Sequence, residues 1–204
     1  MKTALIGIVD YGAGNHNSVK GAIKALGYRS RLVKTEEDLS HLDLLILPGV
    51  GAFSTAMAEI RTMGLDILIR QWAYAGKPLL GICLGMQMLA EASYEHGLTR
   101  GLELIPGEVK PIENPGWHIG WNRLEVTPSA HDFLKASYGK DFYFNHSYEF
   151  HAPQQYVCAT ARLSRPIVAV VKRDNVCGMQ FHPEKSQDAG KEVLQLAIED
   201  LVHA

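Results

Sequence analysis

The sequence contains few cysteines, and they are widely separated. Cys83, Cys158 and Cys177 include no C-x-x-C pair. Three such residues predict neither a disulfide framework nor a zinc site. A reducing compartment, the cytoplasm, is therefore expected, and no metal ion is expected.

The sequence also lacks an excess of charge of either sign and lacks long apolar runs. Its 20 basic residues nearly balance 22 acidic ones, and the formal net charge is −2. This balance argues against nucleic acid or an anionic membrane as the main partner. The apolar runs are too short to span a bilayer. The first residues are typical of a strand rather than a signal peptide, because an acid and a glycine turn follow at residues 10–12.

Length and composition predict one globular domain over residues 1–204. Hydrophobic residues make up 47% of the chain and charged residues 21%, as in ordinary soluble proteins. A chain of this length can bury a substantial core. The sequence has no internal repeat, linker or low-complexity segment.

The first hundred residues alternate between short apolar segments and helical periodicity. Strands are predicted at residues 4–9, 31–34, 44–47 and 79–82. One helix follows from the spacing of Val19, Ala22, Ile23 and Leu26. It would be capped by Asn15 or Asn17 and would stop at Gly27. A second helical stretch covers residues 55–75, with a break at Gly64. Strands that are apolar on both faces indicate a parallel sheet between helices.

The second half has a different pattern. Short strands are predicted at residues 122–126, 142–146, 156–163, 167–172 and 176–181, with turns between them. A last amphipathic helix contains Leu194, Ala197, Ile198 and Leu201. The predicted fold class is therefore α/β. A mostly parallel central sheet has helices on both faces and an antiparallel extension.

Cys83 lies in a motif typical of a reactive nucleophile. Residues 81–85 read G-I-C-L-G and follow a predicted strand, which is the cysteine form of the nucleophile elbow. Small neighbours permit the sharp turn, and the turn lifts the sulfur to the carboxyl edge of the sheet. A helix predicted at residues 86–92 would direct its N-terminus at the sulfur and favour the thiolate. The alternative for an isolated cysteine is a small core thiol.

A base for this nucleophile is predicted near the C-terminus. The segment G-M-Q-F-H-P-E at residues 178–184 contains one of nine histidines. If the extended chain continues, His182 and Glu184 project to the same face, and the carboxylate can orient the imidazole. The alternative is an exposed turn. Together with the elbow, the segment predicts a Cys83, His182 and Glu184 triad.

A glycine-rich loop at residues 48–53 follows another predicted parallel strand. It should lie at the same sheet edge as Cys83. The backbone N–H of Val50 or Gly51, with that of Leu84, is a candidate oxyanion hole. The alternative is a tight turn before a helix.

Three other motifs in the sequence do not by themselves indicate a functional site. Gly12 and Gly14 begin a dinucleotide fingerprint, but Asn17 occupies the third glycine position, so no nucleotide cofactor is predicted. The N-H-S-Y segment at residues 145–148 reads as an ordinary polar turn on spacing alone. The W-H-I-G-W segment at residues 117–121 is expected in the core rather than on an aromatic surface.

The motifs GICLGMQ and GMQFHPEKS together resemble the class I glutamine amidotransferases. Residues 8–15, 48–53 and 81–87 together resemble, within that family, the glutaminase subunits of imidazole glycerol phosphate synthase, and residues 182–186 and 118–122 add to the match. The resemblance spans nearly the whole chain. It implies hydrolysis of glutamine by Cys83, with His182 as acid and base and Glu184 orienting it.

The resemblance also implies a binding site and a partner. Gly51, Gln87, Ser147 and Tyr148 match positions that hold glutamine or line its pocket. Ammonia would pass to a separate (β/α)8-barrel cyclase in a heterodimer of histidine biosynthesis. Neither cofactor nor nucleic acid nor membrane is implied.

Two positions depart from the family pattern and leave alternatives open. Trp117 stands where proline is expected, and Asn145 where an apolar residue is expected. A paralogue that feeds a sugar-amidating synthase is one alternative. A thiol hydrolase of similar fold is another, although it would not need the H-P-E segment. A non-catalytic binding module would be expected to have lost triad residues, and all three are present.

Overall fold

The computed structural model describes residues 3–127 and 132–203. Within these residues, one sheet has nine strands. In spatial order they are β2 (Arg29–Val33), β1 (Leu5–Val9), β3 (Leu44–Gly49), β4 (Leu79–Cys83), β13 (Val176–Met179), β12 (Pro166–Arg173), β11 (Val157–Arg162), β8 (His118–Val126) and β9 (Asp141–His146). The first five strands pair in parallel and the others pair antiparallel. The antiparallel extension is present as predicted, except that β13, which was predicted as part of it, pairs in parallel with β4.

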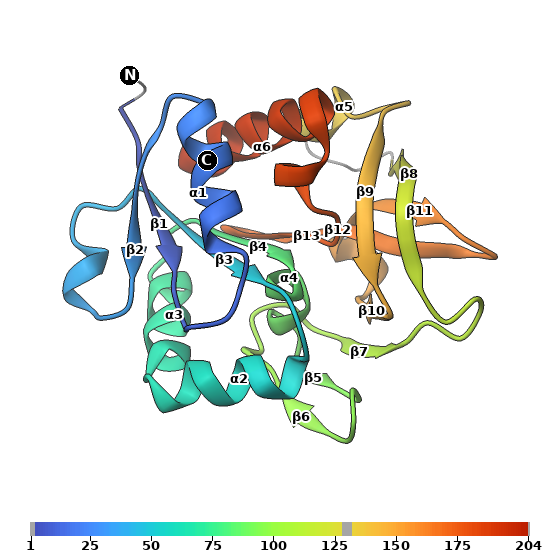
Figure 1. The fold of residues 1–204 in the computed structure, drawn as a ribbon, viewed down its shortest axis with the longest axis horizontal. Helices are drawn as coiled ribbons and strands as arrows, with labels where there is room; N and C mark the ends of the chain where they lie inside the picture. Colours follow the sequence, from blue (N-terminus) through green and yellow to red (C-terminus); the bar gives the residue numbers. More distant parts are fainter. Residues whose placement is uncertain (1–2, 128–131, 204) are drawn as a thin grey trace.

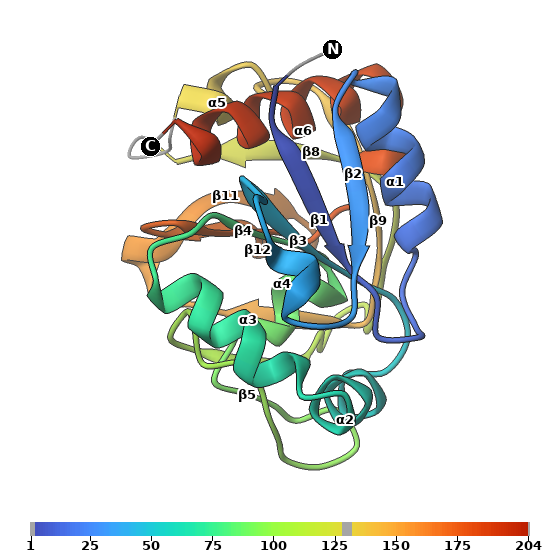
Figure 2. The same ribbon diagram turned by 90° about the vertical axis from the view of Figure 1, so that its left-hand side faces the viewer.

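Helices cover both faces of the parallel half of the sheet (Figures 1 and 2). They are α1 (His16–Ala25) and α6 (Gln187–Val202) on one face, and α2 (Phe53–Thr62) and α3 (Leu65–Tyr74) on the other. Ile8 packs with Val19 in the core beneath α1, whereas Leu47 packs with Met57 in the core beneath α2. Because strand residues alternate between the two faces, both faces of β1 and β3 must be apolar. The α/β class predicted from the sequence is confirmed.

A second, smaller sheet was not predicted. It consists of β10 (Tyr148–His151), β7 (Glu108–Pro111), β5 (Ala92–Ser93) and β6 (Thr99–Arg100). Two of its strands are only two residues long, too short to show a period-two pattern in the sequence. The remaining elements are α4 (Leu84–Met88), α5 (Asp132–Lys135), η1 (Glu37–Leu39), η2 (Gln154–Tyr156) and η3 (Pro183–Lys185).

The helix boundaries confirm one prediction and correct another. The predicted break at Gly64 is present, because this glycine adopts a left-handed conformation (φ 70°) between α2 and α3. The helix predicted at residues 86–92 is wrong, since α4 ends at Met88. The carbonyls of Met88, Leu89 and Ala90 accept hydrogen bonds from the loop at residues 101–105, and the chain then enters β5. Pairing with distant segments therefore overrides helix propensity.

No described helix, in residues 3–127 or 132–203, has the length and apolar character needed to cross a membrane.

Candidate active site

Cys83 is the last residue of β4 and lies directly before α4. Its backbone is strained, with φ 55° and ψ −112°, a conformation that costs a non-glycine residue free energy and is typical of functional sites. The flanking glycines permit the turn. A Cβ atom at Gly81 would lie 2.6 Å from the carbonyl oxygen of Gly85, and one at Gly85 would collide with the carbonyl of Leu47. The predicted nucleophile elbow is therefore present.

His182 and Glu184 are in contact, as predicted, but for a different backbone reason. His182 Nδ1 lies 2.7 Å from Glu184 Oε1, and their side chains are 3% and 1% exposed. The predicted extended chain is wrong, because Pro183–Lys185 is the 3₁₀ helix η3. Ser186 Oγ stabilises this turn by donating to the carbonyl of His182 at 2.7 Å. The tight turn brings the carboxylate back onto the imidazole.

Asn15 also holds Glu184, a contact that the sequence did not predict. Asn15 occupies the N-cap position of α1, but its side chain makes no capping hydrogen bond. Its Nδ2 instead donates to Glu184 Oε1 at 3.1 Å. Asn15 thus lies at the predicted cap position, but its side chain does not have the predicted capping role. It fixes the carboxylate that faces His182.

The surroundings of His182 favour its charged form. Burial by itself lowers the pKa of an imidazole, but hydrogen bonds and charges of Cys83 and Glu184 outweigh burial and raise the pKa of His182 to about 9. An imidazolium between a thiol and a carboxylate can stabilise a thiolate and later donate a proton.

A cavity of about 290 Å³ opens in front of Cys83. The residues that line it are Val50, Gly51, Cys83, Leu84, Gln87, Glu95, Asn145, His146, Ser147, Tyr148, His182 and Lys185. The cavity thus brings together all the predicted oxyanion and binding positions with Cys83 and His182. Glu184 lies outside the lining and contacts the cavity through His182. The reading of residues 145–148 as an ordinary polar turn is wrong, because they form one wall.

The candidate oxyanion loop lies beside the elbow. β3 and β4 are parallel neighbours, and Gly49 is the register partner of Cys83. A Cβ atom at Gly49 would lie 2.7 Å from the backbone nitrogen of Gly85, so only glycine allows the two turns to approach this closely. Tyr11 Oη donates a hydrogen bond to the carbonyl of Pro48 at 3.1 Å and thereby supports the loop. Backbone donation by Val50, Gly51 and Leu84 stays a prediction.

Gln87 joins the nucleophile side of the cavity to the Tyr148 side. Its Nε2 donates to the carbonyl of Tyr148 at 3.0 Å and to Gln180 Oε1 at 2.9 Å. Gln180, which is fully buried, directs its Nε2 toward Cys83 Sγ at 3.9 Å. Sequence reasoning missed Gln180, although it lies two residues before His182.

Glu95 was also missed. This buried side chain lines the cavity and its Oε2 accepts the backbone N–H of Phe53 at 2.6 Å, at the start of α2. An isolated glutamate in a turn gives no sequence signal. In the structure it supplies a carboxylate that can pair with the ammonium group of a bound amino acid.

The expectation that residues 117–121 belong to the core is wrong for most of the segment. Trp117, Ile119 and Trp121 are 56%, 62% and 51% exposed, and only His118 is buried. They form an exposed aromatic face on and before β8, a strand that is four residues longer than predicted. The Trp121 ring lies 6.0 Å from that of Tyr143, which in turn lies 6.4 Å from the His182 ring. The aromatic face therefore adjoins the triad.

Taken together, a strained cysteine, a paired histidine and a small polar cavity can perform acyl transfer from an amide. The chain matches the family model "Glutamine amidotransferase class-I" over residues 7–200 and belongs to that family. It is therefore an enzyme of the glutamine amidotransferase class.

Individual relatives are more specific. The chain is 41% identical over 195 residues to "Imidazole glycerol phosphate synthase subunit HisH" of Listeria innocua, which covers 94% of this chain and 93% of that protein. A protein of the same name from Streptococcus sanguinis is 44% identical over 193 residues, 92% of each chain. The solved structure of PurLQS from Thermotoga maritima aligns with a TM-score of 0.77 and 20% identity over 98% of this chain and all of that one, which supports the fold alone.

Proposed function

We propose that this chain is the glutaminase subunit of an imidazole glycerol phosphate synthase in histidine biosynthesis. It hydrolyses glutamine to glutamate and ammonia and delivers the ammonia to a cyclase subunit. The observation that carries this proposal is the contact of Cys83 and His182 at the cavity of about 290 Å³, with Glu184 Oε1 2.7 Å from His182 Nδ1. The 41% identity to a HisH subunit supports the pathway.

The reaction needs a nucleophile, one mobile proton and a water molecule. The Cys83 thiolate attacks the side-chain amide carbon of glutamine, and the His182 imidazolium gives its proton to the departing ammonia. This leaves a thioester and neutral His182. Neutral His182 then takes a proton from water, and the hydroxide attacks the thioester. The C–S bond breaks to release the Cys83 thiolate and the carboxylic acid, which loses its proton to solvent and leaves as glutamate. Glu184 keeps the imidazole oriented throughout and stabilises its charge.

The cavity walls account for the recognition of glutamine. Glu95 pairs with the α-ammonium group, while Ser147 and the backbone at Gly51 and Tyr148 bind the polar ends of the substrate. Gln87 orders the wall through its contact with Tyr148. Leu84 and either Val50 or Gly51 supply the oxyanion N–H groups.

The proposed partner is a (β/α)8-barrel cyclase, which forms a heterodimer with this chain. Residues 1–204 act as one glutaminase domain, and the complex is cytoplasmic. Ammonia released into neutral water is mostly protonated and is then a poor nucleophile, so direct transfer is favoured. The aromatic face of Trp117, Ile119 and Trp121 adjoins the triad and is exposed, which suits it to contact a partner.

The test is glutamate release with and without the cyclase of histidine biosynthesis and its ligand. Low release by the isolated chain and a rise on addition of the cyclase are expected. Stimulation only by a sugar-amidating synthase would keep the chemistry and overturn the pathway. A glutamine-like chloroketone should add one label at Cys83, and labelling of Cys158 or Cys177 instead would overturn the assignment of the nucleophile.

A further inference from the structure

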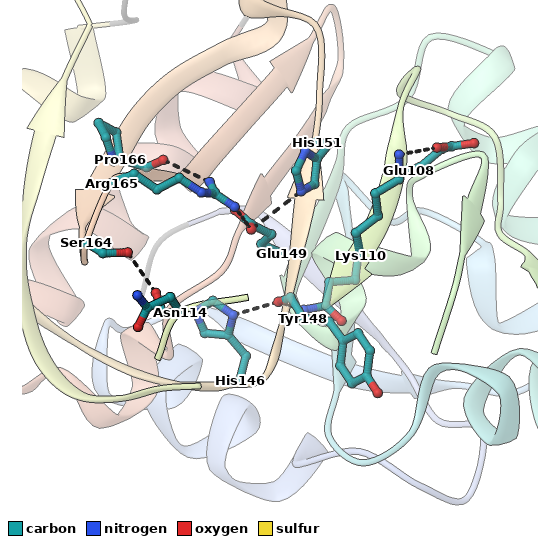
Figure 3. A network of polar contacts seen from close by, with 11 residues as sticks. Glu108, Lys110, Asn114, His146, Tyr148, Glu149, His151, Ser164, Arg165 and Pro166 are labelled. Carbon is teal, nitrogen blue, oxygen red and sulfur yellow. Dashed lines mark hydrogen bonds and ion pairs between the residues drawn. The ribbon is translucent and has the colours of Figure 1, made fainter. Parts of the chain in front are cut away.

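Two buried histidines, one in the cavity lining and one behind it, have no part in the proposed chemistry. His118, on β8, and His146, on β9, are direct cross-strand partners and are 4% and 8% exposed. His118 Nδ1 lies 3.1 Å from His146 Nε2. His146 Nδ1 lies 2.7 Å from the carbonyl oxygen of Tyr148, and Figure 3 shows the ring directed at that carbonyl. The pair therefore ends on a residue that lines the cavity.

The Tyr148 end fixes the proton position in His146. A carbonyl oxygen can only accept a hydrogen bond, so His146 Nδ1 must carry the proton. Because a neutral imidazole carries one proton, His146 Nε2 is then an acceptor. The facing atom, His118 Nδ1, must in turn be the donor, and His118 Nε2 is left as an acceptor.

The other end of the pair leads independently to the same result. Asn122 Oδ1 accepts the backbone N–H of Arg123 at 2.8 Å, and Nδ2 donates to the carbonyl of Arg162 at 2.9 Å. The orientation of the amide is thereby fixed. Its second N–H faces His118 Nε2 at 3.0 Å and can only donate to it. Both ends thus require the Nδ1–H tautomer in both rings.

The setting keeps both rings neutral. Phe144 stacks on His118 with ring centroids 4.1 Å apart and an interplanar angle of 22°. Burial lowers the pKa of His118 to about 4. Burial also lowers the pKa of His146 to about 3, a shift that the nearby His118 and His182 reinforce. Each ring therefore has one donor and one acceptor at neutral pH, as the directed contacts require.

The backbone at Gly120 explains how one strand, β8, supplies both Asn122 and His118 to this series of hydrogen bonds. It has φ 124°, a conformation that residues with a side chain rarely adopt. His118 lies two residues before Gly120 and Asn122 lies two residues after it, and their side chains are within hydrogen-bond distance of each other. The H-x-G-x-N pattern at residues 118–122 thus has a physical meaning that the triad does not use.

We propose that Asn122, His118 and His146 form a one-directional hydrogen-bond relay that positions the Tyr148 carbonyl, and with it the glutamine-binding wall of the cavity. The three are positioning residues, and the inference rests on the proposed glutaminase function. Tyr148 oxygen receives two donors, His146 Nδ1 and Gln87 Nε2, one for each lone pair. Loss of the relay should leave the wall free to move without altering Cys83, His182 or Glu184.

The first test is spectroscopic and needs no activity. Nitrogen-15 labelling of the histidines reports which ring nitrogen carries the proton in the folded wild-type protein at pH 7. We expect His118 and His146 both as neutral Nδ1–H tautomers. An Nε2–H tautomer or an imidazolium at either position would overturn the relay.

The second test is kinetic and uses the glutaminase assay with the cyclase present. His118 does not line the cavity, so His118→Ala acts on glutamine only through His146. Loss of one buried hydrogen bond is worth about a tenfold effect, so KM should rise about tenfold with kcat within about threefold. His118→Asn keeps a donor near the Nδ1 position and should restore KM to within about threefold of wild type.

Matched variants keep this test decisive. Asn122→Ala, at a half-buried position, should raise KM about threefold. It also tests the relay if His118→Ala does not fold. His151→Ala, at an exposed histidine on the neighbouring strand β10, should leave KM unchanged. An unchanged KM in both folded relay variants, or a fall in kcat alone, would overturn the relay and leave the glutaminase proposal standing. If wild type releases no glutamate with any synthase, the proposed function fails, and the tautomer measurement still decides the relay.

Discussion

His182 and His146 are both buried at the same cavity, but at neutral pH the protein keeps His182 positively charged and His146 neutral. His182 is 2% exposed and its pKa is raised to about 9, whereas His146 is 8% exposed and its pKa is lowered to about 3. Burial acts in the same direction on both rings, since it disfavours the charged form. The partners make the difference. His182 faces a thiol and a carboxylate, and His146 faces a carbonyl and another imidazole.

The comparison shows how one small region separates chemistry from positioning. A buried imidazole that acts as a general acid must hold a second proton, and an anionic partner stabilises that charged form. A positioning ring must keep one donor and one acceptor in fixed places, and a second proton would destroy that pattern. Glu184 meets the first need at His182, and the apolar contact with Phe144 helps to meet the second at His118.

The strongest way to break the comparison is to remove the thiol. Cys83→Ala should lower kcat for glutamine hydrolysis by at least about 10⁴-fold, as loss of a nucleophile does in other triads. Because Cys83 is one of the partners that raise the pKa of His182, that pKa should fall in the variant while His146 stays neutral. Glutamate release and histidine NMR titrations measure the two effects. Cys158→Ala, at a buried thiol outside the cavity lining, is the control and should retain activity.

The second largest effect is expected from the carboxylate. Glu184→Gln keeps the shape of the side chain but removes the charge that holds His182 as an imidazolium, so kcat should fall about 10³-fold. Stoichiometric labelling of Cys83 by a chloroketone should remain possible. Unchanged turnover would count against the triad. Glu192→Gln, at a surface ion pair with Lys140, is the control and should have no effect on kcat.

The charged histidine was more accessible to sequence reasoning than the neutral pair. Cys83 is marked by glycines two residues away on each side, and Glu184 lies two residues from His182, so both signals are local. Even so, the reason given for the His182 contact was wrong, because a 3₁₀ turn replaces the extended chain. Spacing predicted the pair, while proline and Ser186 decided the backbone.

The missed contacts join residues far apart in the sequence. Asn15 and Glu184 are 169 positions apart, and Gln87 and Gln180 are 93 apart. No local pattern encodes such pairs, since they depend on how β1, β3, β4 and β13 follow one another across the sheet. The exposed tryptophans were assigned to the core because hydrophobicity indicates burial only on average. A surface that serves a partner violates that average.

Stability against pH should separate the two histidine sites directly. For His182, the folded pKa of about 9 exceeds the ordinary 6.5, so its contribution is complete below pH 6.5 and is lost as pH rises through 9. For His118 and His146, folded values of about 4 and about 3 lie below 6.5, so their contribution is complete above pH 6.5 and is lost as pH falls toward 4. By the size of the shifts, each contribution is on the order of 3 kcal/mol for His182 and His118 and about 5 kcal/mol for His146.

Urea unfolding of variants at pH 5, 7 and 9 measures how the free energy of unfolding changes on the acid side and on the alkaline side of pH 7. His182→Gln should remove the loss of stability between pH 7 and 9 and weaken the loss at pH 5 only slightly, since the charge of His182 adds to the lowered pKa of His146. His146→Asn should reduce the loss at pH 5 to the share of His118 and leave the loss at pH 9. The same change of slope in both variants would contradict a charged His182 and a neutral His146. Comparing variants with wild type cancels the contributions of other titrating groups, provided that they lie far from both sites.

The smallest of these effects on kcat is expected at Asn15, which supports Glu184 and His182 but does not line the cavity. Asn15 Nδ2 donates to Glu184 Oε1, the same oxygen that faces His182. Asn15→Ala removes one hydrogen bond to a charged group, which is worth about 1.5 kcal/mol, so kcat should fall about tenfold. Asn17→Ala, at an exposed position in the first turn of α1, is the matched control and should leave kcat unchanged.

Stability distinguishes this role from helix capping, which the sequence suggested for Asn15. Loss of a side-chain cap typically costs about 1 kcal/mol of stability and leaves chemistry alone. Since the Asn15 side chain makes no capping hydrogen bond, Asn15→Ala should change the free energy of unfolding by less than about 0.5 kcal/mol at pH 7 while turnover falls. The reverse result, a less stable protein with normal kcat, would return Asn15 to the role of a cap. It would also leave Glu184 to orient His182 without that support.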